Sequence, residues 1–207
     1  MNAARGDDDR RQRRLLVGLA GLFFAPLAVA FYLYYGPAAW RPVSHVNHGV
    51  LIDPARPLPD VSLPIAGQNP PRLSKPDLFR NKWTLLYVGA GGCATACRTD
   101  LYNTRQVRSA LNRDMERVQR VFIATGDCCD WVFLSAQHPD LLVLSGAPAA
   151  RPVLDRLPIV NGISPLAAER VYIVDPLGNL MMSYAPDAAA KGLLQDLKRL
   201  LGLSHVG

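Results

Sequence analysis

The chain has 207 residues and a mass of 22.6 kDa, which fits one ordinary domain plus an appendage and excludes a multidomain machine. With 19% charged and 49% hydrophobic residues, it is neither intrinsically disordered nor collagen-like. The formal charge of +6 does not indicate a nucleic-acid partner, because residues 1–14 hold five Arg and three Asp and the remaining excess is interleaved. We therefore expect no nucleic-acid ligand.

Residues 15–35 form an uncharged apolar stretch, LLVGLAGLFFAPLAVAFYLYY. A helix needs about 20 such residues to span a bilayer, and a membrane helix tolerates a proline such as Pro26. Tyrosines gather at the far end of the stretch and arginines at the near end, which places the amino terminus in the cytoplasm. The sequence thus predicts a basic cytoplasmic tail over 1–14 and a single transmembrane helix over 15–35.

The alternative is a cleaved signal peptide, with Ala28-Val29-Ala30 as the cleavage site. The apolar stretch is longer than the about 7–15 residues of a signal peptide, which favours an uncleaved anchor. Under both interpretations the rest of the chain lies across the membrane, which in a bacterial inner membrane means the periplasm. That space is oxidising, so a cysteine pair there can persist as a disulfide.

After the anchor, the sequence predicts a proline-rich tether over residues 36–57 and one folded domain over residues 58–207. Buried-type apolar runs alternate with helical periodicity, and a Pro-Leu-Gly-Asn turn at 176–179 separates the last two strands. This order predicts an α/β domain in which helices flank a mixed central sheet. The predicted elements are strands at 83–88, 121–125, 171–175 and 180–184, a short third element at 141–144, and helices at about 98–120 and 187–201.

Cys93 and Cys97 follow the first strong strand, in Gly89-Ala90-Gly91-Gly92-Cys93-Ala94-Thr95-Ala96-Cys97. A cysteine at the start of a helix has its thiolate stabilised by free backbone N–H groups and the helix dipole. One helical turn separates the two cysteines, so their sulfurs can form a disulfide or share a soft metal. The preceding glycines allow a sharp turn and are expected to leave Cys93 accessible.

Two other interpretations of this stretch remain open. The pair can be an inert disulfide that fixes the loop. The stretch also matches the dinucleotide-binding pattern G-x-G-x-x-A formally, with Asp114 near the distance of a ribose-binding acid. A short exported domain lies away from cytosolic nucleotide pools, which disfavours the nucleotide interpretation.

Cys128 and Cys129 follow the second strand, between two aspartates. Adjacent cysteines bridge each other only with strain, so the sequence favours two thiols or pairing elsewhere. Such thiols can resolve a Cys93–Cys97 disulfide or assist metal capture, although Asp127 and Asp130 would oppose thiolate formation. The alternative is that both cysteines are peripheral.

The sequence resembles the thioredoxin-like Sco/SenC group, which assists copper insertion and thiol chemistry in cytochrome c oxidase assembly. The resemblance rests on the amino-terminal anchor and on the stretches PDVSL at 59–63, LSKPDL at 73–78, KWTLLYV at 82–88 with C-x-x-x-C, and VYIVDPLGN at 171–179. It covers residues 58–202. Closer still, the chain is similar to small membrane-anchored bacterial cytochrome c oxidase assembly proteins, which share the style of CATACR at 93–98 and DPLGNLMM at 175–182.

The resemblance implies a thioredoxin-like fold, with Cys93 and Cys97 as exchange residues or as Cu(I) ligands. The copper binders of the group add a distant His before the Asp-Pro-x-Gly strand, and this chain has none at 161–170. Two thiolates can hold Cu(I), but Cu(II) would lack its imidazole. The expected partner is an oxidase subunit or another assembly factor.

Two further functions stay open. One is a scaffold that binds an oxidase subunit and needs its disulfide only for folding. The other is a general periplasmic disulfide reductase, which the longer C-x-x-x-C spacing disfavours, since C-x-x-C is the usual redox motif.

Overall fold

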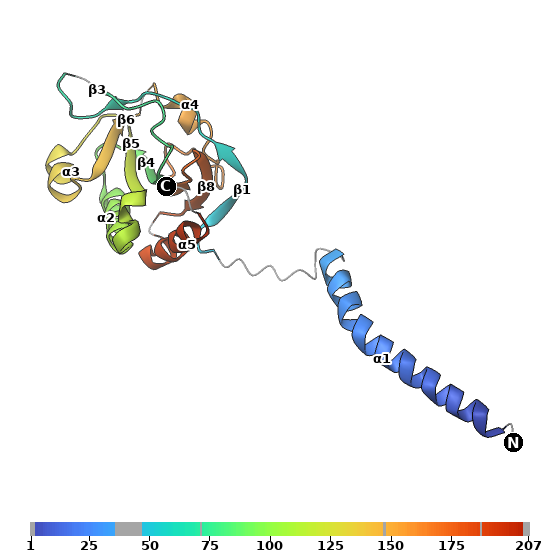
Figure 1. Ribbon diagram of the computed structural model, residues 1–207. Helices are drawn as coiled ribbons and strands as arrows, with labels where there is room; N and C mark the ends of the chain where they lie inside the picture. Colours follow the sequence, from blue (N-terminus) through green and yellow to red (C-terminus); the bar gives the residue numbers. More distant parts are fainter. Residues whose placement is uncertain (1–2, 36–46, 71, 147, 187, 205–207) are drawn as a thin grey trace. The chain divides into compact units, whose positions relative to one another are not determined.

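The computed structural model describes residues 3–35, 47–70, 72–146, 148–186 and 188–204. It divides into two separate units, Met1–His45 and Val46–Gly207. The first unit contains helix α1 (Ala3–Tyr35), which Figure 1 shows. Pro26 lies inside this helix. Its segment Gln12–Tyr35 is long and apolar enough to cross a membrane. Helical structure begins before the expected membrane span, because α1 continues back through most of the basic tail.

The second unit is built on one mixed sheet, which in the described residues has eight strands in the order β1-β8-β7-β4-β5-β6-β2-β3 (Figure 1). The central strands β4, β5 and β6 are parallel, and the remaining neighbours pair antiparallel. The strands are β1 (Val50–Pro57), β2 (Pro64–Ile65), β3 (Arg72–Leu73), β4 (Trp83–Ala90), β5 (Val118–Thr125), β6 (Leu141–Ser145), β7 (Arg170–Val174) and β8 (Asn179–Tyr184).

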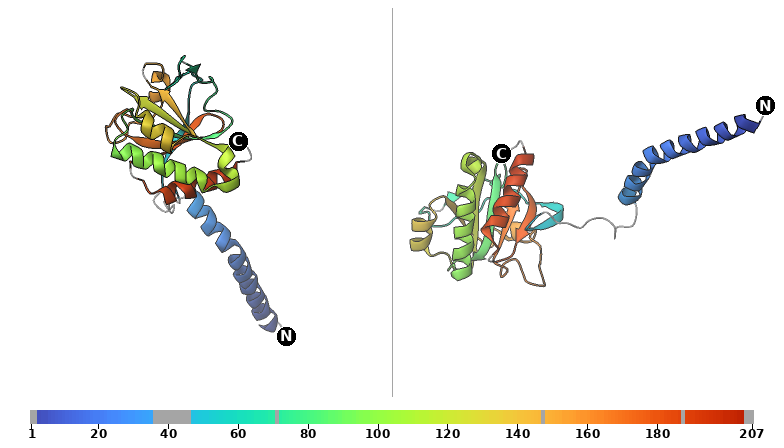
Figure 2. Two further views of the ribbon diagram at one scale, coloured as in Figure 1. Left: turned by 90° about the vertical axis from the view of Figure 1, so that its left-hand side faces the viewer. Right: turned by 90° about the horizontal axis from the view of Figure 1, so that it is seen from below.

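Helices α2 (Thr95–Ser109) and α5 (Ala190–Leu203) lie side by side on one face of this sheet (Figure 2). Residues of β4 alternate between the two faces, since Leu85 and Tyr87 pack with α2 and α5 while Leu86 and Val88 belong to the opposite core. Two shorter helices, α3 (Trp131–Gln137) and α4 (Arg151–Leu154), precede and follow β6. The predicted mixed sheet flanked by helices is therefore confirmed.

One predicted helix is shorter than expected. Periodicity favours a helix over 98–120, but α2 ends at Ser109 and a 3-10 helix, η2 (Asn112–Arg117), follows. Asn112 has a φ of 51°, and this left-handed backbone conformation interrupts the helix. Strand β5 then begins three residues before its predicted start, because Val118 pairs with Trp83 in the parallel ladder.

The domain also begins earlier than expected, since Val50–Pro57, assigned above to the tether, is strand β1. This strand pairs with the outer edge of β8, and a register shift between Leu51 and Arg56 lets it accommodate proline. The carboxylate of Asp196 on α5 accepts hydrogen bonds from the backbone N–H groups of His48 and Gly49, at 2.8 and 2.9 Å. The segment before β1 is thus tied to the domain by a contact that proline content does not reveal.

Candidate functional site

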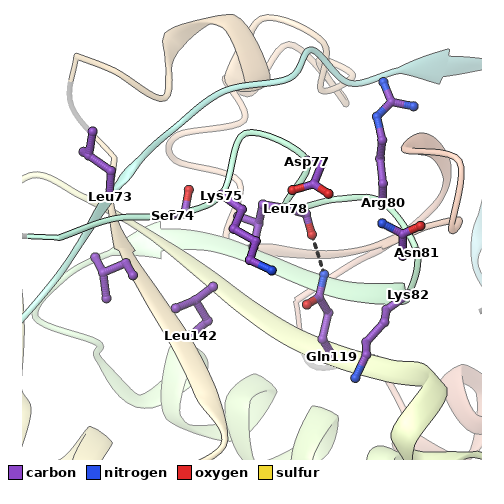
Figure 3. Close-up of a pocket in the computed structure, with 11 residues that line it drawn as sticks. Leu73, Ser74, Lys75, Asp77, Leu78, Arg80, Asn81, Lys82, Gln119 and Leu142 are labelled. Atoms are coloured by element: carbon purple, nitrogen blue, oxygen red, sulfur yellow. Dashed lines mark hydrogen bonds between the residues drawn. The ribbon is translucent and has the colours of Figure 1, made fainter.

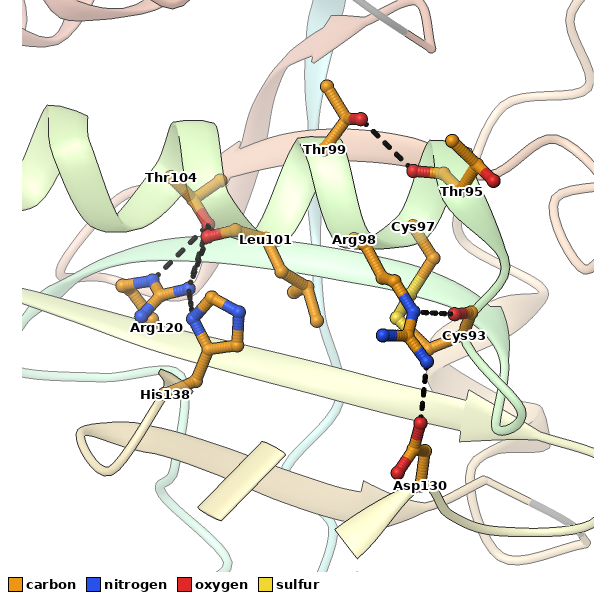
Figure 4. Close-up of a disulfide and its surroundings, with 10 residues drawn as sticks. All are labelled: Cys93, Thr95, Cys97, Arg98, Thr99, Leu101, Thr104, Arg120, Asp130 and His138. Carbon is orange, nitrogen blue, oxygen red and sulfur yellow. Dashed lines mark hydrogen bonds and ion pairs between the residues drawn. A yellow bond between two sulfur atoms is a disulfide. The ribbon is translucent and has the colours of Figure 1, made fainter. Parts of the chain in front are cut away.

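Cys93 and Cys97 lie at the carboxyl end of β4, where the chain turns into α2 (Figure 4). They form a disulfide with Cα atoms 5.0 Å apart. Ala94 precedes the helix and makes no side-chain capping hydrogen bond, so the first N–H groups of α2 are not capped by it. The structure therefore brings the two cysteines together at a helix start, as the sequence predicts.

The disulfide is buried rather than accessible. Cys93 is 1% exposed and Cys97 is fully buried, and both belong to the core that contains Leu101 of α2. The expectation that the glycines leave Cys93 accessible is therefore wrong: Gly92 is exposed, while the Cys93 side chain turns inward beneath α2. Cys93 has a φ of 46°, a left-handed conformation that costs an L-residue about 1–2 kcal/mol.

Arg98 lies next to the buried disulfide (Figure 4). Its Nε atom donates to the carbonyl oxygen of Cys93 at 3.1 Å, and its Nη2 atom donates to Oδ2 of Asp130 at 2.6 Å (Figure 4). The guanidinium also lies over the ring of Phe133, 4.4 Å from the ring centre. The sequence signals this residue only by its position next to Cys97.

Cys128 and Cys129 lie in the loop after β5, with Cys128 exposed and Cys129 half-buried. Their Cα atoms are 3.2 Å apart across a cis peptide bond, and the two sulfur atoms are paired with each other. The expectation of two thiols or of pairing elsewhere is therefore wrong. In this loop conformation both side chains reach the same region, and Cys129 packs against the core that holds Cys93 and Cys97.

The negative charge of Asp130, beside the cysteines, is paired with Arg98. Its Oδ1 atom accepts from the N–H group of Phe133 at 3.1 Å and caps α3, while Oδ2 accepts from Arg98. The expected opposition of Asp130 to a nearby thiolate is therefore offset by Arg98.

No histidine joins the cysteines in the described part of the chain, and no group of three His, Cys, Asp or Glu residues there could hold a metal ion. His48 contacts Asp196, with 3.3 Å between Nδ1 and Oδ1. His138 is buried beside Arg120, well along α2 from the disulfide (Figure 4). Burial first, and then the charges of Arg120 and Arg105, lower the pKa of His138 to about 4.

Two surface cavities differ in their relation to the cysteines. A cavity of about 400 Å³ lies near the amino ends of β4 and β5, where Lys82 and Gln119 line it (Figure 3). That is the opposite end of these strands from the disulfides. A smaller cavity of about 310 Å³ is lined by Gly126, beside the Cys128–Cys129 loop, and by Leu166.

A parallel strand followed by a disulfide at the start of a flanking helix defines a protein of the thioredoxin-like class. Residues 83–204 match the family model described as "Transmembrane-like, thioredoxin-like, C-terminal domain". The match covers more than half of the chain, and the chain belongs to this family. Comparison with curated protein sequences gives no match.

Solved structures confirm the expected resemblance to the Sco group. Apo Sco1 from Thermus thermophilus is 24% identical over 76% of this chain and 99% of its own, with a TM-score of 0.58. Copper-bound ScoI from Bradyrhizobium japonicum is 22% identical over 70% and 99%, with a TM-score of 0.51. A thiol:disulfide interchange protein from Chlorobium tepidum is 17% identical over 72% and 99%, with a TM-score of 0.53. At these identities the likeness establishes the fold.

Proposed function

We propose that this chain is a membrane-anchored factor for cytochrome c oxidase assembly that works through Cys93 and Cys97. The pair acts by thiol–disulfide exchange, by carrying Cu(I), or by both. Its partner is an oxidase subunit or another assembly factor. The observation that carries the proposal is the Cys93–Cys97 disulfide between β4 and α2, in a chain with a membrane-type helix and Sco-like neighbours.

In the exchange mode, the reduced pair attacks a disulfide of the partner. The Cys93 thiolate forms a mixed disulfide with one partner sulfur and releases the other, and the Cys97 thiolate then displaces the partner from Cys93. The uncapped start of α2 supports this chemistry, since helix N–H groups stabilise a thiolate. The left-handed backbone of Cys93 also supports it, because such conformations cluster at functional sites.

In the metal mode, copper is cargo. Bradyrhizobium japonicum ScoI and yeast Sco1 have been solved with copper bound. Reduced Cys93 and Cys97 offer two thiolates, which suit the soft Cu(I) ion. The stretch 161–170 offers no imidazole, so the donor set fits Cu(I) and does not fit Cu(II).

The two modes separate in an anaerobic Cu(I) titration of the reduced full-length protein in detergent. The metal mode predicts one Cu(I) bound by the native chain and its loss in Cys93→Ser. Cys128→Ser is the matched control, because it removes a thiol from the neighbouring loop. Unchanged copper stoichiometry in Cys93→Ser would rule out the metal mode and leave exchange.

We infer that the anchor lies in a bacterial inner membrane with residues 1–14 in the cytoplasm and the domain in the periplasm. The arginines before the apolar span support this orientation. Protease added to intact spheroplasts should digest the domain and spare the amino-terminal tail. Protection of the domain until the cells are lysed would reverse the assigned orientation.

A second function is favoured by one observation, the burial of Cys93 and Cys97. A disulfide that is closed inside a core can have a purely structural role. In that case it stabilises the fold of a scaffold that binds an oxidase subunit. The reduction potential distinguishes the two roles, since structural disulfides fall below about −300 mV and exchange pairs lie above it. Measuring the reduction potential of Cys93–Cys97 in a glutathione or dithiothreitol redox series therefore tests the scaffold role.

A further inference from the structure

The burial of Cys93–Cys97 poses an access problem for exchange with another protein. The thiolate of a protein reductant must reach a disulfide sulfur in line, yet Cys93 is 1% exposed and Arg98 lies across its carbonyl oxygen. Cys128–Cys129 has the opposite character, because Cys128 is exposed and Cys129 is half-buried. The two disulfides thus differ in which molecules can reach them.

The two disulfides are neighbours because of the sheet register. Parallel strands β4 and β5 end together, with Ala90 opposite Thr125, so the loops that follow them run side by side. The N–H group of Gly91 donates to the carbonyl oxygen of Thr125 at 3.0 Å. A Cβ atom at residue 91 would lie 2.8 Å from the Cα atom of Cys128, so only glycine permits this approach.

Two further contacts hold the loops together. Arg98 bridges the carbonyl oxygen of Cys93 and the carboxylate of Asp130, one from each loop. Cys129 packs against the core that contains Cys93 and Cys97. The half-buried member of the exposed disulfide therefore packs against the same core as the buried disulfide.

Apolar side chains flank the exposed sulfur. Trp131 and Val132 begin α3 directly after this loop, with Val132 84% exposed and Trp131 37% exposed. Exposed apolar residues beside a reactive group suit contact with another protein more than reaction with a small polar thiol. This surface therefore suits a protein dithiol as the reductant.

We propose that Cys128–Cys129 is the electron entry site of this protein and passes two electrons from a protein dithiol to Cys93–Cys97. The proposal rests on the exchange mode described above and adds the route by which the buried pair is reduced. The first thiolate of the partner attacks Cys128 Sγ and breaks the Cys128–Cys129 bond, releasing the Cys129 thiolate. The partner's second thiol displaces Cys128 and leaves as a disulfide.

Two exchange steps within the protein then pass the two electrons to Cys93–Cys97. The Cys129 thiolate attacks Cys93 Sγ, forming a Cys129–Cys93 bond and releasing the Cys97 thiolate. The Cys128 thiolate attacks Cys129 Sγ, which restores Cys128–Cys129 and releases the Cys93 thiolate. The partner has been oxidised, Cys93–Cys97 has been reduced, and the two protons of the partner dithiol are taken up by Cys93 and Cys97.

The direct test compares the full-length native protein with Cys128→Ser/Cys129→Ser, both oxidised and in detergent. Reduced thioredoxin is the probe, and thiols are alkylated at timed intervals. Trypsin places the two pairs on different peptides, since it cuts after Lys82, Arg98 and Arg120, so each is read separately by mass spectrometry. We expect reduction of Cys93–Cys97 to slow at least about tenfold in the variant, because direct attack is blocked by burial.

A phosphine reductant is the matched control, because it is small enough to act without the entry pair and should reduce Cys93–Cys97 in both proteins at similar rates. Equal rates with thioredoxin in both proteins would overturn the entry site and leave the proposed function intact. If thioredoxin leaves Cys93–Cys97 oxidised in both proteins, the entry site and the exchange mode fail together, and the metal mode and the scaffold remain.

A second pair of variants tests the internal step without any reductant. In Cys97→Ser/Cys128→Ser the remaining thiols are Cys93 and Cys129, and mild oxidation should link the two tryptic peptides within one chain. Cys97→Ser/Cys129→Ser retains the exposed Cys128 and should link several-fold less. Absence of the Cys93–Cys129 link, in protein whose circular dichroism is native, would overturn the relay.

Discussion

Asp196 is the residue that joins the start of the domain to its last helix. It is 3% exposed and accepts hydrogen bonds from the N–H groups of His48 and Gly49 and from the hydroxyl of Tyr184 at 2.9 Å. Burial alone would raise the pKa of Asp196, but these hydrogen bonds outweigh burial and lower it. Burial and the Asp196 carboxylate together raise the pKa of Tyr184.

We expect Asp196→Asn to reduce the free energy of unfolding by about 2–3 kcal/mol, since hydrogen bonds to a buried charge are lost. Tyr184→Phe, which removes one donor, should cost about 1 kcal/mol. Denaturant titration followed by tryptophan fluorescence measures both. Because the folded pKa of Asp196 lies below its unfolded value, this stabilisation is present at neutral pH and is lost as the pH falls below about 4. A loss of unfolding free energy no larger in Asp196→Asn than in Tyr184→Phe would contradict the role of the Asp196 charge.

His138 gives a second pH dependence in a different range. Its pKa is about 4 in the folded protein, against about 6.5 unfolded, so between these values the unfolded chain binds a proton that the folded chain does not. The free energy of unfolding should therefore fall by about 1–2 kcal/mol from pH 7 to pH 5. In His138→Gln this part of the fall should vanish, and an unchanged slope in that variant would show that His138 is not its source.

At the scale of single residues, the position of Cys93 and Cys97 at a helix start could be predicted from the sequence, but their burial could not. Cys93 and Cys97 stand out because strand, glycines and helix are consecutive in the sequence. The closure of the core over them depends on Leu101 and on residues of α5, a hundred positions further on. Asp196 had a usable signal, since it precedes Leu197 on the buried side of a leucine-rich helix.

Among the elements, β5 and α2 are joined by one buried arginine. Arg120 of β5 is 1% exposed and donates to the carbonyl oxygen of Leu101 at 2.6 Å, to Thr104 and to Asp140 at 3.0 Å. Burial lowers its pKa to about 10, with Asp140 acting against that shift. The guanidinium thus fixes the helix that carries Cys97 on the strand whose loop carries Cys128.

We expect Arg120→Met to destabilise the domain by about 2–4 kcal/mol, because several buried acceptors lose their donor. It should also raise the pKa of His138, since one of the charges that lower it is gone. Histidine resonances in a pH titration measure this second effect. Arg113→Met on the exposed side of η2 is the control, and an unchanged His138 pKa in Arg120→Met would contradict the assignment.

Helices and strands were predicted correctly where the hydrophobic periodicity extends over enough residues to be recognised. Strands β4, β7 and β8 and helix α5 match their predicted positions within a few residues. Strands β2 and β3 have two residues each, and α4 has four, so they carry no period. Strand β1 was missed because its prolines are typical of a tether, whereas an edge strand tolerates them. Residue 187, where the last helix was expected to begin, lies outside the described residues.

For the whole molecule, we propose that an anchored thioredoxin-like domain serves oxidase assembly through Cys93 and Cys97. The fold is shared by copper carriers, exchange proteins and scaffolds, so the cysteines must decide among them. The anchor would confine their action to partners at the same membrane.

The most direct measurement is cytochrome c oxidase activity in membranes of cells that lack the native chain and express the full-length Cys93→Ser/Cys97→Ser variant. We expect activity to stay at the level of cells without the protein, while the variant remains folded and in the membrane fraction. Activity restored to the level given by the native chain would show that the cysteines are not needed for oxidase assembly and would leave the scaffold.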